Sequence, residues 1–250
     1  MISKALLKEL CGYKLQKKCD AEGLFVVEGV KMAGEAMASG WRIAAVCATE
    51  QWMAANRQQL VADKAYEVTQ GDLERLSGMQ SPNEVWMLVE RGTLQPAEDG
   101  MVIVLDHLQD PGNMGTIIRT ADWLGIRHIV CSRDTVSCYN PKVVQASMGG
   151  IFRTAMEYCD LRQWLADYRY PIYGTRLQGD DLYGTSLTVP CAVVVGNESR
   201  GISAEVCARL TRSITIPNRG GSCESLNASV ATAIVCSEIM RQNSLQSTGD

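Results

Sequence analysis

The sequence predicts an α/β protein built from two modules, and two observations carry this prediction. Strand-like apolar runs alternate with helical stretches along the chain, and a segment at residues 91–100 with two glycines and a proline interrupts the alternation. Alternation of this kind implies parallel sheets covered by helices on both faces. We therefore predict a small α/β domain at residues 1–91, a linker at 92–99 and a larger α/β domain at 100–250.

The predicted strands are short apolar runs bounded by polar or glycine-containing segments. In the first module they lie at residues 24–29, 43–49, 65–69 and 84–90. In the second module they lie at residues 101–106, 128–132, 171–175, 191–196 and 213–217. Helices are predicted between them, for example at residues 30–39, and at residues 139–150 with Asn140 as the cap and Pro141 in the first turn.

The stretch LDHLQDPGNMGTIIRTADWLG, residues 105–125, runs from an apolar strand through a polar turn into a helix that opens with Asn113 and Gly115. At 100° per residue, its apolar side chains share one side of the helix. They are Ile117, Ile118, Ala121 and Leu124. Arg119 lies nearly opposite this stripe, on the side of Gly115. Taken alone, the pattern favours a solvated arginine that pairs with Asp122.

The last predicted helix, at residues 225–242, is apolar on more than one side. Leu226, Val230, Ala233 and Met240 share one side, whereas Val235 and Ile239 lie nearly opposite. A helix of this kind is buried inside its domain or is covered by a second subunit. We therefore expect a homodimer contact on one side of this helix.

Composition excludes several classes of protein. Ten cysteines stand at irregular intervals without a C-x-x-C pair, and the two histidines are far apart, so we expect neither a disulfide framework nor a metal site. The chain has no apolar run long enough for a membrane span and no apolar signal segment at its N-terminus. These features predict a cytoplasmic protein with no membrane partner.

Charge argues against a uniformly basic nucleic-acid-binding surface. The formal net charge is −4 at pH 7, so a polyanion would have to bind at local patches. One such patch is the first 18 residues, which carry five lysines against one glutamate. Within it, Lys14, Lys17 and Lys18 either contact RNA or only solubilise a helix, and the sequence leaves both interpretations open.

Three junctions in the second module have the same character. Residues 105–119, 193–201 and 214–229 each place glycine, asparagine and a reactive polar residue just after a buried strand. Ligands of open α/β sheets bind beyond the carboxyl ends of the strands, although turns in general favour glycine and asparagine. The glycine spacing does not fit a dinucleotide fingerprint, and neither a Walker lysine nor a G-x-S-x-G elbow is present. Exposed backbone groups at such turns could hold an adenine edge.

The three junctions resemble, in order, the three motifs of the SpoU–TrmH branch of SPOUT RNA methyltransferases. NMGTIIRTA is similar to motif 1, GNESRGIS to motif 2, and IP followed by ESLNASVATAI to motif 3. Residues 3–35 resemble the substrate-binding domain that precedes many of these enzymes, which is itself similar to small RNA-binding ribosomal proteins. Together the resemblance spans nearly the whole chain.

The resemblance implies a SPOUT domain with a parallel sheet and a deep trefoil knot, active as a homodimer. It implies transfer of a methyl group from S-adenosylmethionine (AdoMet) to a ribose 2′-hydroxyl of RNA, with ribosomal RNA favoured by the first module. Two alternatives stay open at this point. One is a transfer-RNA enzyme of the same chemistry, and the other is a non-catalytic RNA-binding or ribosome-assembly factor.

The resemblance also assigns the catalytic residues, which are Arg119, Asn113, Glu198, Ser225 and Asn227. Asn113 would cap its helix and orient the ribose or the arginine, and Glu198 would position the substrate or the arginine. Ser225 would bind substrate or, alternatively, cap the last helix, and Asn227 would hold the loop and the cofactor region together. Arg119 is the family's proposed base; because a guanidinium keeps its proton, we favour a clamp on the neighbouring phosphate and on the developing alkoxide.

The residues implied for the cofactor come from three segments of the second module. They are Thr175, Leu177, Gly196, Asn197, Gly201, Ile216, Pro217 and Leu226, and no metal is implied. The sequence departs from the family pattern at two places. Gln145 stands where relatives often have a basic residue, and motif 3 carries one extra residue before Ser225, which leaves the register of residues 220–222 open.

Overall fold

The computed structural model describes residues 2–79, 84–97 and 99–246, and the chain divides into two compact units. Unit 1 consists of Met1–Thr93 and Cys138–Arg153, and unit 2 of Leu94–Ser137 and Thr154–Asp250. The first division falls inside the segment predicted as a linker. Residues 138–153 lie inside the predicted second domain, at 100–250, but they pack within unit 1. The chain enters this segment from unit 2 and returns to unit 2 after it.

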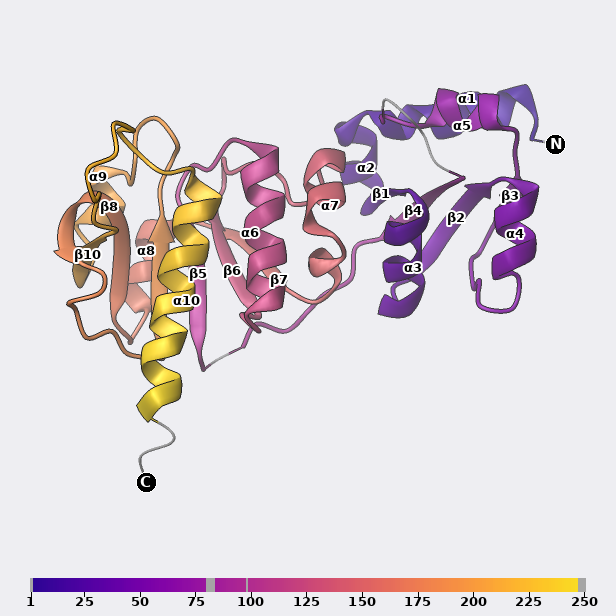
Figure 1. Ribbon diagram of the computed structural model, residues 1–250. Helices are drawn as coiled ribbons and strands as arrows, with labels where there is room; N and C mark the ends of the chain where they lie inside the picture. Colours follow the sequence, from indigo (N-terminus) through magenta and orange to yellow (C-terminus); the bar gives the residue numbers. More distant parts are fainter. Residues whose placement is uncertain (1, 80–83, 98, 247–250) are drawn as a thin grey trace. The chain divides into compact units, whose positions relative to one another are not determined.

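Unit 1 contains a four-stranded sheet in the order β1-β4-β2-β3 (Figure 1). Its strands are β1 (Leu24–Glu28), β2 (Ile43–Ala48), β3 (Ala65–Glu67) and β4 (Val85–Glu90). The prediction of a parallel sheet is wrong for this unit. β4 runs antiparallel to both β1 and β2, and only β2 and β3 are parallel. Apolar patterning located all four strands, but it carries no information about the direction in which a returning strand inserts.

Helices pack against this sheet. They are α1 (Lys4–Cys11), η1 (Gly12–Lys14), α2 (Gln16–Glu22), α3 (Val30–Ser39), α4 (Glu50–Asn56), α5 (Gln70–Leu76), α7 (Pro141–Ser147) and η2 (Gly150–Phe152). Leu7 and Leu10 of α1 join one core cluster with Trp86 and Leu88 of β4. α7 packs against β1, where the rings of Phe25 and Tyr139 lie 5.0 Å apart.

The structure distinguishes among the N-terminal lysines and tests one predicted cap. The Lys18 ammonium lies 3.9 Å from the centre of the Tyr13 ring and donates a hydrogen bond to the Glu9 carbonyl at 3.0 Å. Lys18 is therefore held against its own unit. In α7, the Asn140 side chain accepts a hydrogen bond from the Lys142 amide at 2.9 Å, and Pro141 occupies the first turn. The predicted capping of this helix is confirmed.

Unit 2 contains a six-stranded sheet in the order β10-β8-β9-β5-β6-β7, and every neighbouring pair is parallel. Its strands are β5 (Met101–Leu105), β6 (His128–Ser132), β7 (Ala155–Cys159), β8 (Ile172–Asp181), β9 (Cys191–Val195) and β10 (Arg212–Thr215). The predicted parallel sheet is confirmed here. The edge strand β7 was not predicted, and β8 continues six residues beyond the predicted end at residue 175.

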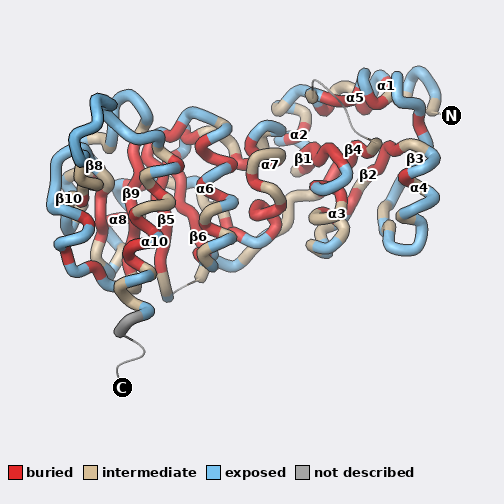
Figure 2. The backbone as a smooth tube through the Cα atoms, in the orientation of Figure 1, coloured by how far each residue is buried: buried red, intermediate tan, exposed pale blue. Residues whose placement is uncertain are grey.

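Four helices flank this sheet: α6 (Pro111–Trp123), α8 (Leu161–Asp167), α9 (Ala204–Cys207) and α10 (Ala228–Gln246). α6 and α10 pack against each other in front of the sheet in Figure 1, and α8 lies behind it. Leu161 and Leu165 of α8 and Val206 of α9 join a core cluster with alternate residues of the central strands, including Val104 and Val194. Figure 2 shows these strands as the most deeply buried part of the unit.

The last helix has the two-sided apolar character that its sequence predicts. Val235, Cys236 and Ile239 are buried, whereas Val230 is 46% exposed. Near its end, the side chains of Gln242 and Asn243 accept hydrogen bonds from the amides of Leu187 (2.9 Å) and Val189 (3.2 Å). α10 is thus tied to the connection that precedes β9. The trefoil threading of the chain stays a prediction.

No helix in the described ranges is both long enough and apolar enough to cross a membrane.

Candidate active site at the carboxyl edge of the parallel sheet

The helix α6 begins earlier than the sequence predicted, and this changes the role of Asn113. Asp110 is the N-cap, because its side chain accepts a hydrogen bond from the Asn113 amide at 2.7 Å, and Pro111 follows in the first turn. Aspartate at the cap and proline at the next position are both strongly favoured. The prediction that Asn113 caps the helix is wrong. Its side chain is left available for contacts with other segments.

The side chain of Asn113 joins two of the predicted motifs. Its Nδ2 donates a hydrogen bond to Glu198 Oε1 at 3.1 Å, and its Oδ1 accepts one from Asn227 Nδ2 at 2.7 Å. Asn113 is 7% exposed, and a buried amide needs both its donor and its acceptor satisfied. Because Glu198 can only accept when ionised, the orientation of the Asn113 amide is set. Residues from all three junctions therefore meet at one point.

Glu198 also lies against the N-terminus of α6. Its carboxylate accepts hydrogen bonds from the backbone amides of Asp110 (3.2 Å) and Gln109 (3.5 Å). The first amides of a helix lack partners inside the helix and carry partial positive charge, so an anion here is favourable. These hydrogen bonds hold the Glu198 carboxylate at the start of α6, and Glu198 remains exposed to solvent. The sequence predicted a positioning role for Glu198 but not this contact with the backbone.

The turn after β9 is closed by its own backbone. Asn197 and Gly201 exchange hydrogen bonds in both directions, at 3.0 and 2.9 Å. The Asn197 side chain accepts from the amides of Ser199 and Arg200, both at 3.0 Å, and its Nδ2 donates to the His107 carbonyl at 2.8 Å. A Cβ on Gly196 would lie 2.2 Å from the carbonyl carbon of Gly201. Only glycine fits at position 196, and the turn is tightly defined.

Asn227, and not Ser225, caps the last helix. Asn227 Oδ1 accepts hydrogen bonds from the Ser229 amide (2.9 Å), the Ser229 hydroxyl (2.6 Å) and the Val230 amide (3.3 Å). The alternative that Ser225 is the cap is therefore wrong, because α10 begins at Ala228. Ser225 is exposed and forms no side-chain hydrogen bond within the described ranges. One asparagine thus starts α10 and contacts α6 at the same time.

The segment of motif 3 that carries the extra residue contains a small turn, which the sequence did not lead us to predict. Asn218 Oδ1 accepts from the amides of Gly220 (2.9 Å) and Gly221 (2.7 Å), and its Nδ2 donates to the Gly221 carbonyl at 3.0 Å. Gly220 has a φ of 105°, which favours glycine. The signal in the sequence was the N-x-G-G pattern, in which an asparagine can bond to amides two and three residues later.

Most of the residues predicted for the cofactor lie in β8 or directly after its two neighbours in the sheet, β9 and β10, and Leu226 lies just before α10. Thr175 lies inside β8, where its hydroxyl donates to the Val194 carbonyl at 3.1 Å. Thr175 was predicted as the last residue of its strand, but β8 continues to Asp181, so Leu177 lies in the strand as well. Ile216 and Pro217 follow β10 and are half-buried, whereas Leu177 is 72% exposed and Leu226 is 49% exposed.

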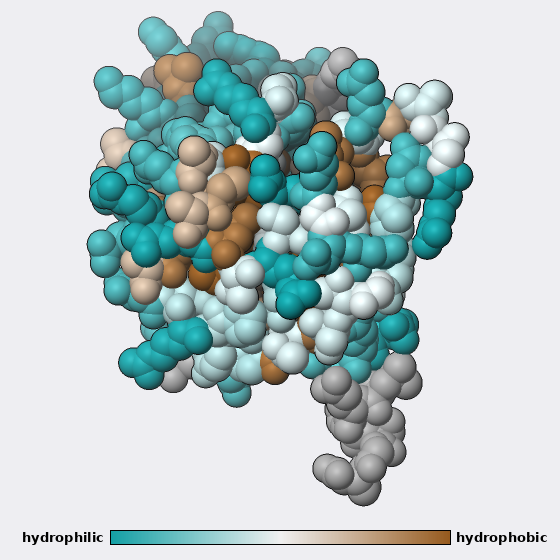
Figure 3. All heavy atoms as spheres, turned by 90° about the vertical axis from the view of Figure 1, so that its left-hand side faces the viewer, coloured by the Kyte–Doolittle hydropathy of each residue, from teal (hydrophilic) through white to brown (hydrophobic). Residues whose placement is uncertain are grey.

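Exposed apolar residues beside a glycine turn suit an adenosine-containing ligand. Hydrophobic atoms are visible between hydrophilic ones on the β10 side of unit 2 (Figure 3). A heteroaromatic ring needs apolar contacts on its faces and hydrogen-bonding groups at its edge. The half-buried Ile216 and Pro217 offer the first, and the backbone of the same turn at Gly201, which has open space beside its Cα, offers the second. The residues present therefore fit AdoMet chemically.

Arg119 stands apart from the other predicted catalytic residues. It is exposed and has no hydrogen bond or ion pair to another residue in the ranges that the structure describes. Asp122, the partner suggested by simple helix spacing, forms an ion pair with Arg127 at 3.1 Å. Arg119 follows Asn113 by six residues on α6, about 9 Å along the helix axis and on a different side. Within one chain, the structure does not bring Arg119 to the Asn113–Glu198–Asn227 contact.

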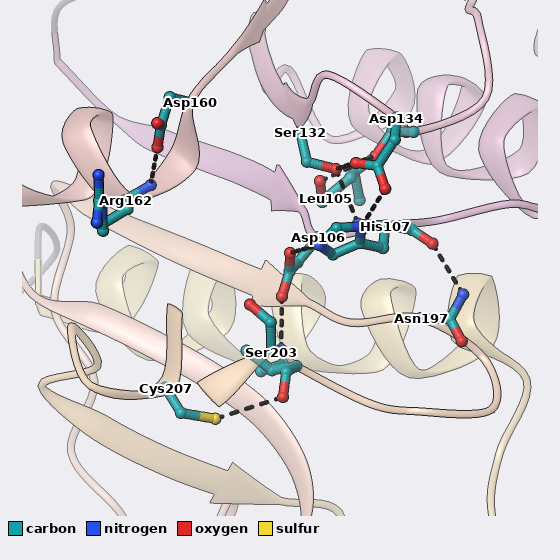
Figure 4. Close-up of polar contacts among 12 residues, drawn as sticks. Leu105, Asp106, His107, Ser132, Asp134, Asp160, Arg162, Asn197, Ser203 and Cys207 are labelled. Carbon is teal, nitrogen blue, oxygen red and sulfur yellow. Dashed lines mark hydrogen bonds and ion pairs between the residues drawn. The ribbon is translucent and has the colours of Figure 1, made fainter. Parts of the chain in front are cut away.

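A cavity of about 310 Å³ opens at the carboxyl ends of β5, β6 and β7, on the side of α8 and α9. Asp106 and His107 of β5's end, Ser132 and Asp160 contribute to its wall, and Figure 4 shows their polar contacts. Asp106 is 1% exposed and accepts a hydrogen bond from the Ser203 amide at 2.7 Å. None of the predicted catalytic or cofactor residues lines this cavity. The signal in the sequence that could have located this cavity is the polar residue directly after each of the strands β5, β6 and β7.

Comparison with known proteins gives the class to which this fold and site belong. The model of the SpoU rRNA Methylase family matches residues 100–237, which is more than half of the chain. The chain therefore belongs to the SpoU rRNA methylase family. A second model, the MRM3-like substrate binding domain, matches residues 4–86. The predicted family and the predicted kind of first module are both confirmed.

The similarity to individual relatives covers most of this chain. It is 25% identical over 215 residues to the 23S rRNA (guanosine(2553)-2'-O)-methyltransferase RlmP of Bacillus subtilis, covering 84% of this chain and 86% of that protein. It is 32% identical over 201 residues to the 23S rRNA (guanosine-2'-O-)-methyltransferase RlmB of Pasteurella multocida, covering 75% of this chain and 77% of that protein.

Solved structures resemble this chain in fold as well as in sequence. A TrmH-family protein from Porphyromonas gingivalis superposes with a TM-score of 0.87 at 37% identity, over 97% of this chain and 99% of that one. The AdoMet-bound rRNA methyltransferase from Sinorhizobium meliloti superposes with a TM-score of 0.83 at 26% identity, over 96% of each chain. The predicted fold class, a parallel α/β domain preceded by a small α/β domain, is confirmed.

Proposed function

We propose that this protein transfers a methyl group from AdoMet to a ribose 2′-hydroxyl of ribosomal RNA. The observation that carries the proposal is the contact of Asn113 with both Glu198 and Asn227. These residues come from three motifs that are far apart in the sequence, and they meet where ligands of parallel sheets bind. The named activities of relatives, which are 23S rRNA 2′-O-methyltransferases, support the same reaction and the same class of RNA.

In this proposal the cofactor is held by the residues that follow β9 and β10. Backbone groups of Gly196, Asn197 and Gly201 and the apolar side chains of Ile216, Pro217 and Leu226 would bind it, with Thr175 and Leu177 contributing from β8. AdoMet supplies an electrophilic methyl group on a sulfonium. Asn113, Glu198 and Asn227, of which only Glu198 carries a carboxyl group, would position the reacting groups. Ser225, exposed beside this cluster in sequence, would contact the RNA.

Arg119 would hold the nucleophile's side of the reaction. A ribose hydroxyl is a weak nucleophile near neutral pH, and its oxygen must be aligned behind the methyl carbon before attack. A guanidinium keeps its proton, so Arg119 would clamp the adjacent phosphate through two parallel hydrogen bonds and stabilise the negative charge that develops on the oxygen. Its exposure, without a partner in its own chain among the described residues, leaves all its donors available for RNA.

A homodimer would complete this site. α6 and α10 pack together on one face of unit 2, and both carry exposed apolar residues, including Trp123 (88% exposed) and Val230 (46% exposed). Large exposed apolar side chains on adjacent helices are typical of a contact surface. A second subunit on this face would bring its own Arg119 or active-site cluster to the first, which would explain why one chain does not unite them.

Unit 1 would bind the RNA outside the reacting ribose. The family of its matching domain and the lysines near the N-terminus support this assignment. Lys14 and Lys17 are exposed, whereas Lys18 is engaged with Tyr13 and Glu9. Because rRNA is made and assembled in the cytoplasm of cells like those of the bacterial relatives, the proposed compartment is cytoplasmic.

A methyl-transfer assay tests the proposal against its two alternatives. Radiolabelled AdoMet is incubated with the protein and with separated rRNA and tRNA fractions from a host deficient in methylation, beside the Arg119→Ala variant. Label in rRNA, lost in the variant, supports the proposal. Label confined to tRNA supports a transfer-RNA enzyme instead. Cofactor binding without label in any RNA supports a non-catalytic binding or assembly factor.

A further inference from the structure

We propose that His107 is a positioning residue for the proposed active site. Its ring is held between two carboxylates, and this holds its own backbone in an unusual conformation on which the contacts of Asn197 and Glu198 both depend. The inference rests on the proposed roles of Asn197 in cofactor binding and Glu198 in catalysis. His107 belongs to none of the three motifs and does not contact the residues of the reaction through its side chain.

The backbone of His107 lies in a region that side chains disfavour. Its φ is 57°, and among the described residues only His107 and Met148 have a positive φ without being glycine. In this left-handed region the Cβ crowds the following carbonyl, so the conformation is populated only when surrounding contacts stabilise it. At position 107 the chain leaves the buried strand β5 and turns toward α6.

The ring of His107 supplies the stabilising contacts. Its Nδ1 contacts the Asp134 carboxylate, and its Nε2 lies 3.4 Å from Asp106 Oδ1 (Figure 4). Both carboxylates are themselves fixed, because Asp106 accepts from the Ser203 amide at 2.7 Å and Asp134 accepts from the Ser132 hydroxyl at 2.9 Å. The Ser132 hydroxyl oxygen also accepts from the His107 amide at 2.9 Å.

Two hydrogen-bonding relationships transmit this conformation to the site. The His107 carbonyl accepts from Asn197 Nδ2 at 2.8 Å, which attaches the turn after β9 to the end of β5. Two and three residues further along, the amides of Gln109 and Asp110 donate to Glu198. If residue 107 leaves the left-handed region, its carbonyl and the following peptide groups reorient together. Asn197 and Glu198 would then lose partners at the same time.

The expected consequence is a loss of cofactor affinity rather than of RNA affinity. A binding-competent turn that is populated only in part of the molecules weakens apparent affinity by that fraction. A β-branched residue at position 107 disfavours the left-handed conformation, so we expect His107→Val to weaken AdoMet binding about 10-fold. His107→Gly permits the conformation but does not hold it, and its expected loss is about 3-fold. His107→Asn tolerates the conformation and should resemble the glycine variant.

The test compares these variants with a matched pair at Met148, the other non-glycine residue with positive φ, which lies in unit 1. AdoMet affinity is measured by calorimetry, and the KM for rRNA and kcat are measured separately, with thermal unfolding as a check on folding. The expected result is the order wild type, Gly or Asn, then Val in AdoMet affinity, with the KM for rRNA changed less than about 2-fold. Met148→Gly and Met148→Val should leave AdoMet affinity unchanged.

Two results would overturn the inference. One is AdoMet affinity within 2-fold of wild type in His107→Val, and the other is an equal loss in Met148→Val. If His107→Val does not fold, the glycine and asparagine variants decide, because full wild-type affinity in both contradicts a role for the ring. Asn197→Ala keeps the two failures apart. If it also binds AdoMet normally, the proposed cofactor site is wrong; if it alone loses binding, only the role of His107 is wrong.

Discussion

The side-chain amide of Asn227 donates a hydrogen bond to the side-chain oxygen of Asn113 across a distance of 2.7 Å and 114 residues of sequence. Asn227 caps α10 and Asn113 lies in the first turn of α6, so the contact joins the starts of two helices. Asn113 in turn donates to Glu198. The three motifs therefore act on one another directly, and a change at one of them should be felt at the others.

The contact between Asn113 and Glu198 predicts a charge-dependent effect. Asn113→Asp places a second carboxylate against Glu198, and like charges at this distance repel strongly in a partly buried site. We expect kcat/KM to fall on the order of 100-fold in Asn113→Asp, and by less in Asn113→Ala. Asn113→Asp should also weaken AdoMet binding, and adding Glu198→Gln should restore part of this AdoMet affinity, because the repulsion is removed. Strictly additive losses in this double-mutant cycle would contradict a direct contact.

The proposed clamp role of Arg119 predicts that lysine cannot replace it. Lysine keeps the charge but not the planar pair of donors that binds a phosphate at two points. Arg119→Lys should therefore lose at least about 100-fold in turnover, nearly as much as Arg119→Ala. Arg127→Lys is a suitable control, since Arg127 is an exposed arginine already paired with Asp122 and should retain activity within about 2-fold. Near wild-type turnover in Arg119→Lys would contradict the proposed clamp role of Arg119.

Alanine should act differently at Gly196, where it would meet the backbone, than at Gly201 and Gly125, where only the positive φ disfavours it. In Gly196→Ala the new methyl group would meet the backbone of Gly201 at 2.2 Å, so the turn must open and AdoMet binding should be lost. Gly201 has a φ of 70° with open space around it, and Gly125 has a φ of 72° with equal space. Alanine at either costs about 1–3 kcal/mol of stability through the backbone alone. Calorimetry should show that Gly125→Ala binds AdoMet normally; undiminished binding in Gly196→Ala is the contrary result.

Burial of His128 predicts a loss of stability in mild acid. His128 is 4% exposed, and burial lowers the pKa of its ring below the ordinary value of 6.5, an effect that the neighbouring Glu157 offsets only in part. The unfolded chain therefore binds more protons than the folded one just below pH 6.5, so stability is full above that pH and falls as the pH decreases. Thermal unfolding at pH 8 and 5.5 measures the effect.

Two variants should change the pH dependence of stability in opposite directions. His128→Phe removes the titrating group and should flatten the change in unfolding temperature between the two pH values. Glu157→Gln removes the group that favours the charged ring, so it should make the acid-induced loss larger. An unchanged pH dependence in both variants would assign the effect to other residues.

Sequence reasoning located most of the parallel sheet for a physical reason. Strands buried on both faces are continuous apolar runs, and β5, β6 and β9 are of this kind. β7 was not predicted, because its edge position leaves Met156, Glu157 and Cys159 only half-buried and its sequence is therefore not a continuous apolar run. The direction of β4 escaped because an apolar run looks the same in a parallel and an antiparallel pair.

The site was predicted as a set of residues and not as a geometry. Capping is decided within four residues, yet Asp110 and Asn113 both suit the start of α6, and only the observed hydrogen bond from Asn113's own amide selects Asp110. The meeting of Asn113 with Asn227 depends on how α6 and α10 pack, which no local pattern encodes. His107 escaped for another reason: its backbone conformation is one that a residue other than glycine rarely adopts.

The measurement that tests the central claim most directly is the chemical position of the transferred methyl group. Ribosomal RNA labelled by the protein and radiolabelled AdoMet is hydrolysed in alkali, which cleaves beside every free 2′-hydroxyl. The proposed reaction predicts label in a dinucleotide that resists alkali, at one site, and much slower labelling of the same dinucleotide by the Asn113→Asp variant. Label recovered in mononucleotides would place the methyl group on a base, and the proposed ribose 2′-O-methylation would be wrong.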